Sequence, residues 1–307
     1  MLKRILLSVF LFNAVIAFSQ NPYVFGGPDP NDLLPFPPEQ MKQLKEAKVK
    51  TVTIRHNDDV HKEVYSFNKE GQALSAESFN SKGKRTYNWM NILYRYNTNG
   101  QLTIRHYWED GWQWYDSLTY DKEGRLTSYF GYNDEYLKKK KDHYRTTYYN
   151  MKLESMNSNY AVLKDSTAED SSITRYLLDR NNKCIKIIYD DCIDSLASIT
   201  NKDSTVEKIL YKCKEDTAFY LGVETTFKNG KKIREEQFSY SEPRNHLRTV
   251  RYFYNDHGQL IHRSNDNMWT GNYFYIYMWE GSLLFKEIHE GSDYTTVCTY
   301  SYTFWKD

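Results

Sequence analysis

The chain of 307 residues carries 41 Lys and Arg against 40 Asp and Glu, and 16% of its residues are aromatic. A near-neutral chain has no general electrostatic attraction for polyanions, so the balance of charge excludes nucleic acid as a partner. The length is sufficient for a sizeable core in one large or two ordinary domains.

Residues 1–19 predict a secretory signal peptide. Two bases precede an apolar run over Ile5–Phe18, and Ala17 and Ser19 are the small residues that a signal peptidase reads, which predicts cleavage before Gln20. A retained N-terminal anchor is the alternative, but the run is short for a bilayer and a Pro-rich segment follows it. Removing the signal leaves 39 bases against 40 acids.

Residues 20–48 predict a Pro-rich leader and a short helix. Six of the seven prolines lie in the first 38 residues, and one lies beyond them. Because proline cannot donate to a β ladder, its scarcity after the leader indicates an extensive sheet. The segment Glu39–Lys48 follows two prolines and predicts a helix with Met41 and Leu44 on one face.

One turn motif recurs through the remaining domain, residues 49–307. It reads aromatic, Asn or Asp, any two residues, Gly, and then Gln, Arg or Lys, as in Tyr120–Arg125. Asn or Asp favours the first position of a type I turn, and Gly favours the position where φ is positive. Such a turn joins two antiparallel strands in a β-hairpin. The predicted turn-forming pairs are Asn68 with Gly71, Asn80 with Gly83, Asn97 with Gly100, Asp121 with Gly124, and Asn255 with Gly258.

Further turn signals lie between these copies. A degenerate copy has Asn182 in the glycine position, and Asn229-Gly230 and Asp110-Gly111 predict two-residue hairpins. The strands between the turns alternate, and 28 tyrosines suit a sheet face that is partly wet. The sequence therefore predicts an all-β fold of repeated antiparallel hairpins that form an extended, curved meander sheet.

The copy Tyr120-Asp121-x-x-Gly124-Arg125-Leu126 resembles the YD repeat of RHS (rearrangement hot spot) proteins. The likeness covers 51–131 and 250–290, with a fainter likeness over 175–240. It implies an exported β-repeat protein of a Gram-negative cell envelope, in the periplasm, at the cell surface or outside the cell. Long arrays in that family build β shells that can enclose toxin segments, but this chain is far shorter.

Three of the four cysteines, Cys184, Cys192 and Cys213, fall within thirty residues. An exported chain meets an oxidising compartment, so this clustering predicts one local disulfide. Four cysteines allow three complete pairings, and the sequence does not choose among them. A zinc site is the competing interpretation, and no Cys-x-x-Cys spacing supports it.

No cluster of residues predicts a catalytic centre, a metal site or a cofactor. No Gly-x-Ser-x-Gly elbow, His-Glu-x-x-His helix or phosphate loop occurs, which favours a non-enzymatic role. Asp190, Asp191 and Asp194 lack the spacing of a calcium loop and predict a solvated turn. Histidines five apart on a strand face opposite sides unless a turn intervenes. The two such pairs are His56 with His61 and His257 with His262.

An aromatic hairpin around Asp110-Gly111 provides the candidate binding residues. A two-residue turn there would set Glu109 opposite Trp112 and Tyr107 opposite Trp114. Tyr107, Trp112 and Trp114 would then form a flat aromatic platform that can stack sugars or bind a peptide. The alternative is cross-strand packing that stabilises the sheet.

The sequence leaves three hypotheses for function. The first is a non-enzymatic binding or scaffold module at the cell envelope, with an envelope protein or a glycan as partner and no membrane-integrated part. The second is a secreted hydrolase that acts on glycans. The third is an outer-membrane β-barrel, which alternating strands and aromatics favour, whereas charges on both faces and the C-terminal Lys306-Asp307 disfavour it.

Overall fold

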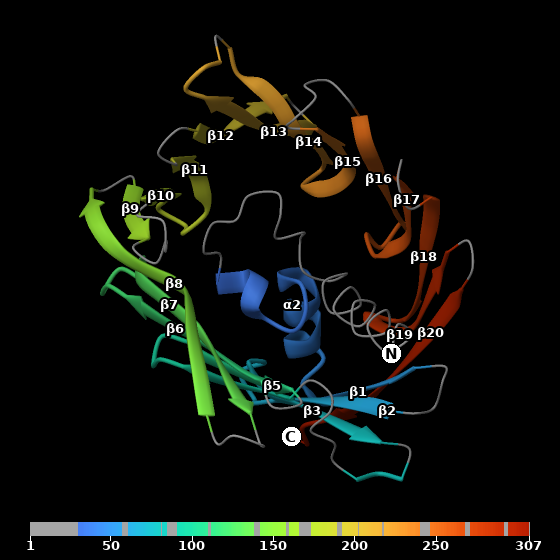
Figure 1. Ribbon diagram of the computed structural model, residues 1–307. Helices are drawn as coiled ribbons and strands as arrows, with labels where there is room; N and C mark the ends of the chain where they lie inside the picture. The colour runs from blue at the N-terminus through green and yellow to red at the C-terminus, as the bar shows by residue number, and fades with distance from the viewer. Residues whose placement is uncertain are drawn as a thin grey trace.

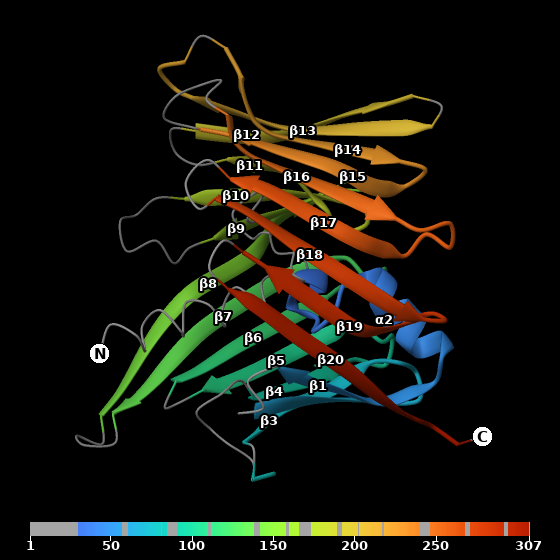
Figure 2. The same cartoon turned by 90° about the vertical axis from the view of Figure 1, so that its right-hand side faces the viewer.

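The sheet closes on itself into a barrel. In the computed structural model each strand pairs antiparallel with the next, and β1 (Val49–His56) also pairs with β20 (Thr295–Phe304), so the 20 strands of the described residues form one ring. Figure 1 looks along the barrel and Figure 2 shows it from the side. The structure describes residues 30–56, 61–80, 82–84, 91–109, 112–137, 142–157, 160–165, 173–188, 192–201, 203–216, 218–239, 246–267, 271–291 and 294–306.

Two short helices, η1 (Pro30–Leu33) and α2 (Pro38–Glu46), precede the strands. No helix of the described residues is long and apolar enough to cross a membrane. The strands between β1 and β20 are β2 (His61–Phe67), β3 (Ala73–Asn80), β4 (Asn91–Tyr96), β5 (Leu102–Glu109), β6 (Trp112–Tyr120), β7 (Leu126–Leu137), β8 (Asp142–Met156), β9 (Tyr160–Asp165), β10 (Thr174–Asp179), β11 (Cys184–Ile188), β12 (Cys192–Thr200), β13 (Ser204–Cys213), β14 (Tyr220–Lys228), β15 (Lys231–Phe238), β16 (His246–Tyr254), β17 (Leu260–Asn267), β18 (Gly271–Glu280) and β19 (Leu283–Glu290).

The predicted extended, curved meander sheet is therefore wrong, because its two edges meet. The pairing of β1 with β20 extends from Val49 opposite Phe304 to His56 opposite Cys298. At this seam Thr51 Oγ1 lies 2.6 Å from the Oγ1 of Thr303, a residue 252 positions away in the chain. Closure pairs the main-chain groups that an open edge would expose. The turn motif could not predict it, since a turn specifies only the pairing of two successive strands.

The resemblance to RHS YD-repeat proteins is overturned by the same finding. An array of separable β-hairpin repeats would end in two free edges, whereas here every hairpin pairs with a neighbour on both sides and the first hairpin meets the last strand. The motif is a local turn signal within one continuous ring. Its shared residues reflect the backbone demands of that turn, which unrelated β proteins meet in the same way.

The motif residues have the geometry of a type I turn followed by a left-handed residue. At the β6–β7 turn, the Gly124 N–H donates to the Asp121 carbonyl at 3.1 Å, and φ of Gly124 is 83°. The Asp121 carboxylate accepts from the main-chain N–H of Glu123 and of Arg125, and from the Arg125 guanidinium at 2.8 Å. Desolvation alone would raise the pKa of Asp121, but these hydrogen bonds and the Arg125 charge hold that pKa below its usual value.

Four of the five predicted motif turns lie at the same end of the barrel, because the spacing between them spans an even number of strands. They connect β2 to β3, β4 to β5, β6 to β7, and β16 to β17. We call this the turn end. The fifth, at Asn80 and Gly83, follows β3 and lies at the opposite end. Asn182 takes the glycine position of another turn at the turn end, with φ of 64°.

Two motif positions link each turn to the neighbouring hairpin. The side chain after the glycine donates to the glycine carbonyl of the next turn, from Gln72 Nε2 to Gly100 at 3.1 Å and from Gln101 Nε2 to Gly124 at 2.8 Å. The aromatic at the start of the motif donates backwards. The Tyr120 hydroxyl reaches the Leu102 carbonyl at 2.9 Å. A motif that specifies one turn therefore also links that turn to its neighbour in the barrel.

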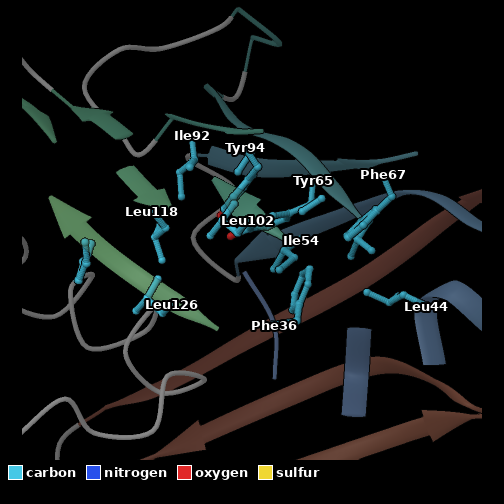
Figure 3. Packing of buried hydrophobic residues seen from close by; sticks show 14 of the residues in the cluster. Phe36, Leu44, Ile54, Tyr65, Phe67, Ile92, Tyr94, Leu102, Leu118 and Leu126 are labelled. Atoms are coloured by element: carbon cyan, nitrogen blue, oxygen red, sulfur yellow. The ribbon is translucent and has the colours of Figure 1, made fainter. Parts of the chain in front are cut away.

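Helix α2 lies inside the ring of strands at the turn end (Figure 1). Pro38 occupies its first turn, where a missing N–H costs nothing. Leu44 of the helix is 2% exposed, and Phe36 before it lies with its ring centroid 4.9 Å from that of Tyr65 and 6.2 Å from that of Phe67 (Figure 3). Burial of each such side chain contributes about 1.5–3 kcal/mol, so the helix is a packed plug of this end.

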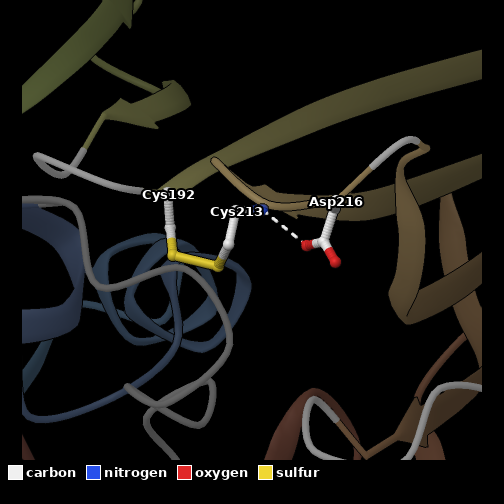
Figure 4. Close-up of a disulfide and its surroundings, with 3 residues drawn as sticks. All are labelled: Cys192, Cys213 and Asp216. Carbon is white, nitrogen blue, oxygen red and sulfur yellow. Dashed lines mark hydrogen bonds between the residues drawn. A yellow bond between two sulfur atoms is a disulfide. The ribbon is translucent and has the colours of Figure 1, made fainter.

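A disulfide joins Cys192 of β12 to Cys213 of β13, directly opposite each other in the ladder (Figure 4). The Cys213 N–H donates to Asp216 Oδ2 at 2.7 Å. Cys184, the third member of the predicted cluster, and Cys298 are buried thiols outside this bond. The local disulfide is thus a staple between two successive strands.

Replacing Gly71 with Ala should destabilise the protein far more than replacing Gly83 with Ala. Both glycines have positive φ, 79° and 73°, so both variants bear a backbone strain of about 1 kcal/mol. A Cβ at Gly71 would also lie 2.4 Å from Lys45 Cβ in α2, whereas one at Gly83 would meet nothing within 4 Å. We expect Gly71→Ala to lower the melting temperature further and to make the α2 segment sensitive to protease. Equal losses in the two variants would contradict a packed plug.

Candidate functional site

The inner wall of the barrel changes in chemistry from one end to the other, as β6 shows. Alternation puts Trp112, Trp114, Asp116, Leu118 and Tyr120 on one face. Asp116 and Leu118 are 0% and 2% exposed, and Leu118 shares a core cluster with α2, so this face points inward. From the end opposite the turn end towards the turn end, the wall passes from tryptophan to a carboxylate and then to aliphatic core.

The carboxylate of Asp116 is the centre of a buried ion pair. Arg105 Nε lies 2.7 Å from Asp116 Oδ2, and the Tyr129 hydroxyl donates to Asp116 Oδ1 at 2.8 Å. The three residues lie on the successive strands β5, β6 and β7. Both carboxylate oxygens therefore have a strong donor, which offsets the cost of removing the charge from water.

A second polar cluster lies at the barrel seam. The Tyr65 hydroxyl donates to Glu63 Oε2 at 2.7 Å, and His56 Nε2 lies 3.6 Å from Glu63 Oε1. Cys298 Sγ lies 3.4 Å from the other ring nitrogen of His56. Because the thiol and the carboxylate contact opposite sides of the imidazole, they do not converge on one point. No group of metal-binding side chains occurs among the described residues.

Two further buried carboxylates complete the polar wall. Glu287 is 1% exposed and contacts His289 Nε2 at 2.5 Å and the Tyr300 hydroxyl at 2.8 Å. Glu235 is 6% exposed and pairs with Lys232 at 2.9 Å and with Arg248 at 3.3 Å. The inner wall thus combines a buried aliphatic core with tyrosines and compensated charges.

The aromatic platform predicted from the sequence lies on this inner wall, at the end opposite α2. Tyr107 pairs with Trp114 and Glu109 with Trp112, as a two-residue turn requires. The ring centroids of Tyr107 and Trp114 are 4.7 Å apart, and those of Trp112 and Trp114 are 6.1 Å apart with planes at 24°. Tyr107 packs against the core, while Trp112 is 38% exposed.

The other residues considered from the sequence are not brought together. His56 and His61 end β1 and begin β2, with residues 57–60 between them, and His257 lies in the β16–β17 turn. His262 lies on the outer face, between the rings of Phe253 and Phe274. Asp194 is in β12, whereas Asp190 and Asp191 lie outside the described residues.

The Arg105–Asp116 pair was missed from the sequence, although a signal for it exists. The hairpin register that sets Tyr107 opposite Trp114 also sets Arg105 opposite Asp116. Two opposite charges at facing positions of one hairpin predict an ion pair. In the clusters around Glu63 and Glu287, only the contact of Cys298 with His56 requires the seam between β1 and β20. The other contacts lie within one strand or between the successive strands β1 and β2 and β19 and β20.

The outer face carries both aromatic rows and ion pairs. The rings of His106, Tyr115 and Tyr132 stack in succession at 4.0 and 4.8 Å across β5, β6 and β7. On the outer face of β13, β14 and β15, Lys208 pairs with Glu224 at 2.8 Å and Arg234 pairs with Glu236 at 2.7 Å. These residues alternate along their strands with buried residues that face inward. The outer surface is therefore mixed in character.

No family model and no curated protein matches the chain. Among solved structures, a porin-like protein from Bacteroides uniformis is similar over 84% of this chain and 97% of that one, at 10% sequence identity and a TM-score of 0.30. A similarity this distant carries no functional assignment.

The barrel itself bears on the three hypotheses. A closed antiparallel ring fits the outer-membrane β-barrel alternative better than a binding or scaffold module built on an open sheet. It also agrees with the predicted export to the cell envelope.

Replacing Arg105 with Ala should destabilise the protein by about 3–5 kcal/mol, because it leaves the Asp116 carboxylate buried without its cation. Replacing Tyr129 with Phe removes one hydrogen bond to the same carboxylate and should cost about 1.5 kcal/mol. Urea unfolding of the purified protein measures both. Arg95→Ala is the control, since Arg95 is an exposed position of the adjacent β4, and should change stability by less than about 0.5 kcal/mol. A loss for Arg105→Ala no greater than for Arg95→Ala would contradict the buried pair.

Proposed function

We propose that this chain is an outer-membrane β-barrel of a Gram-negative bacterium whose lumen is plugged at one end by its own helix α2. The observation that carries the proposal is the pairing of β1 with β20. Hydrocarbon leaves no water to satisfy main-chain N–H and C=O groups, so a sheet can span a bilayer only as a closed ring. The antiparallel pairing and the even number of described strands also agree with barrels of this class.

The two ends of the barrel differ as they do in outer-membrane barrels. At the turn end, the segments between successive strands are two to five residues long. At the opposite end they reach ten residues, as between β3 and β4. Short periplasmic turns and longer outer loops are typical of such barrels. This asymmetry supports an orientation with the turn end and α2 towards the periplasm.

The distribution of side chains gives further support. Large apolar residues are exposed in the alternation that faces outward, among them Leu93 at 42%, Phe253 at 46% and Phe274 at 38%. The inner wall instead carries the paired charges of Arg105, Asp116 and Glu287. Paired charges inside the barrel and exposed apolar groups outside it agree with a lipid-facing exterior.

A second candidate, an exported water-soluble barrel, is favoured by the ion pairs of the outer face. Lys208–Glu224, Arg234–Glu236 and Arg251–Asp266 lie there, and a basic side chain at the middle of a bilayer costs about 2–4 kcal/mol. Nearer the interface that cost falls to about 0–1 kcal/mol. The depth of these pairs therefore separates the two candidates. The sequence predicts that the chain has no membrane-integrated part. This stays a prediction, and it agrees with the second candidate.

Expression of the full chain with its N-terminal segment in a Gram-negative host tests the proposal. We expect the protein in the outer-membrane fraction, resistant to carbonate extraction and soluble only in detergent. An unheated sample should run faster in SDS electrophoresis than a boiled one, because a closed barrel resists the detergent. A folded mature chain that stays monomeric in buffer without detergent would refute membrane insertion and support the soluble barrel.

A further inference from the structure

We infer that Tyr107, Trp112 and Trp114 form a binding site for a neutral saccharide on the inner wall of the barrel. We call these three side chains the aromatic platform. The inference requires the closed barrel and the inward direction of this face, and it holds whether or not the barrel lies in a bilayer. The proposed function names no ligand for the lumen, and this inference assigns one class of ligand to it.

Exposure distinguishes the platform from ordinary core packing. Deeper on the same face of β6, Asp116 and Leu118 are 0% and 2% exposed, whereas Trp112 is 38% exposed. A tryptophan that only stabilised the sheet would contribute most when covered, since burial of apolar surface is what stabilises the fold. An inward-facing indole that stays uncovered is a surface on which a ligand can stack.

The geometry of the rings favours a sugar over a cation. The planes of Trp112 and Trp114 are 24° apart and their centroids are separated by 6.1 Å along the strand. Nearly parallel rings at this spacing offer successive stacking surfaces for the C–H faces of sugar rings. Recognition of a cation instead uses several rings turned around one point. Here only Tyr107 is strongly tilted, at 59° to Trp114.

The neighbouring positions supply polar partners. The register places Asn133 next to Trp114, on the same face of the sheet. An amide group beside an aromatic surface exchanges hydrogen bonds with hydroxyls and carries no charge. Among the described residues of this face, Arg105 is already paired with Asp116 at 2.7 Å. This combination points to a neutral, hydroxyl-rich ligand.

Intrinsic tryptophan fluorescence of the purified, folded full chain tests the inference. Maltohexaose, cellohexaose and laminarihexaose serve as neutral probes, with choline as a cationic probe. We expect at least one hexasaccharide to change the fluorescence saturably. Trp112→Ala should weaken its binding about tenfold, which corresponds to about 1.4 kcal/mol, because the variant loses a stacking surface. Trp114→Phe should keep part of the affinity.

Trp108→Ala is the matched control, since Trp108 lies in the same hairpin, opposite Gln113, on the outer face. It should leave saccharide affinity unchanged. Melting temperatures of all variants show whether each is folded, and the exposed Trp112 should be replaceable without loss of the fold. Absence of binding by the folded protein, equal weakening by Trp108→Ala, or binding of choline in place of the sugars would overturn the inference. None of these outcomes depends on the membrane fractionation, so the two proposals fail separately.

Discussion

The pairing of β1 with β20 is the contact on which the rest of the structure depends. It brings together segments at the two ends of the sheet and turns a ladder with two open edges into a ring. Once the ring is closed, every strand has an inner and an outer face, and α2 has a mouth to occupy. The contact of Cys298 with His56, beside Glu63, exists only because of this seam. Closure carries a large entropic cost because its partners are remote in sequence, and the paired main chain offsets that cost.

The turn end shows how a short repeated motif can serve a whole barrel. Each copy specifies its own turn through Asn or Asp and a residue of positive φ. Its remaining positions act between hairpins, as Gln101 does with the Gly124 carbonyl and Tyr120 with the Leu102 carbonyl. Because successive copies return to the same end, these links connect neighbouring turns beside the plug. The copy at Gly83 lies at the other end, where a Cβ on the glycine would meet nothing within 4 Å.

The two faces of the wall carry the functional argument. Inside, each buried carboxylate has a cationic or hydroxyl partner on a neighbouring strand, so the lumen is polar without being strongly charged. Outside, apolar side chains such as Phe274 alternate with ion pairs such as Arg234–Glu236. The polar inner wall and the closed ring support the outer-membrane proposal. The ion pairs on the outer face favour the alternative of a water-soluble barrel. The aromatic platform is common to both, since it faces the lumen.

By itself, the sequence determined local features: the all-β class, the turns of the five motif copies, a short helix after the prolines, and the register that sets Tyr107 opposite Trp114. These follow from backbone preferences and alternation over a few residues. Only the tertiary structure decided that the sheet closes, that the platform faces inward, and that Glu63 and Glu287 are buried. A strand with alternating polar and aromatic residues has the same sequence pattern whether its aromatic side chains face the inside or the outside of the barrel. That choice, like the pairing of Thr51 with Thr303, is made by contacts far apart in the chain, about which local patterns carry no information.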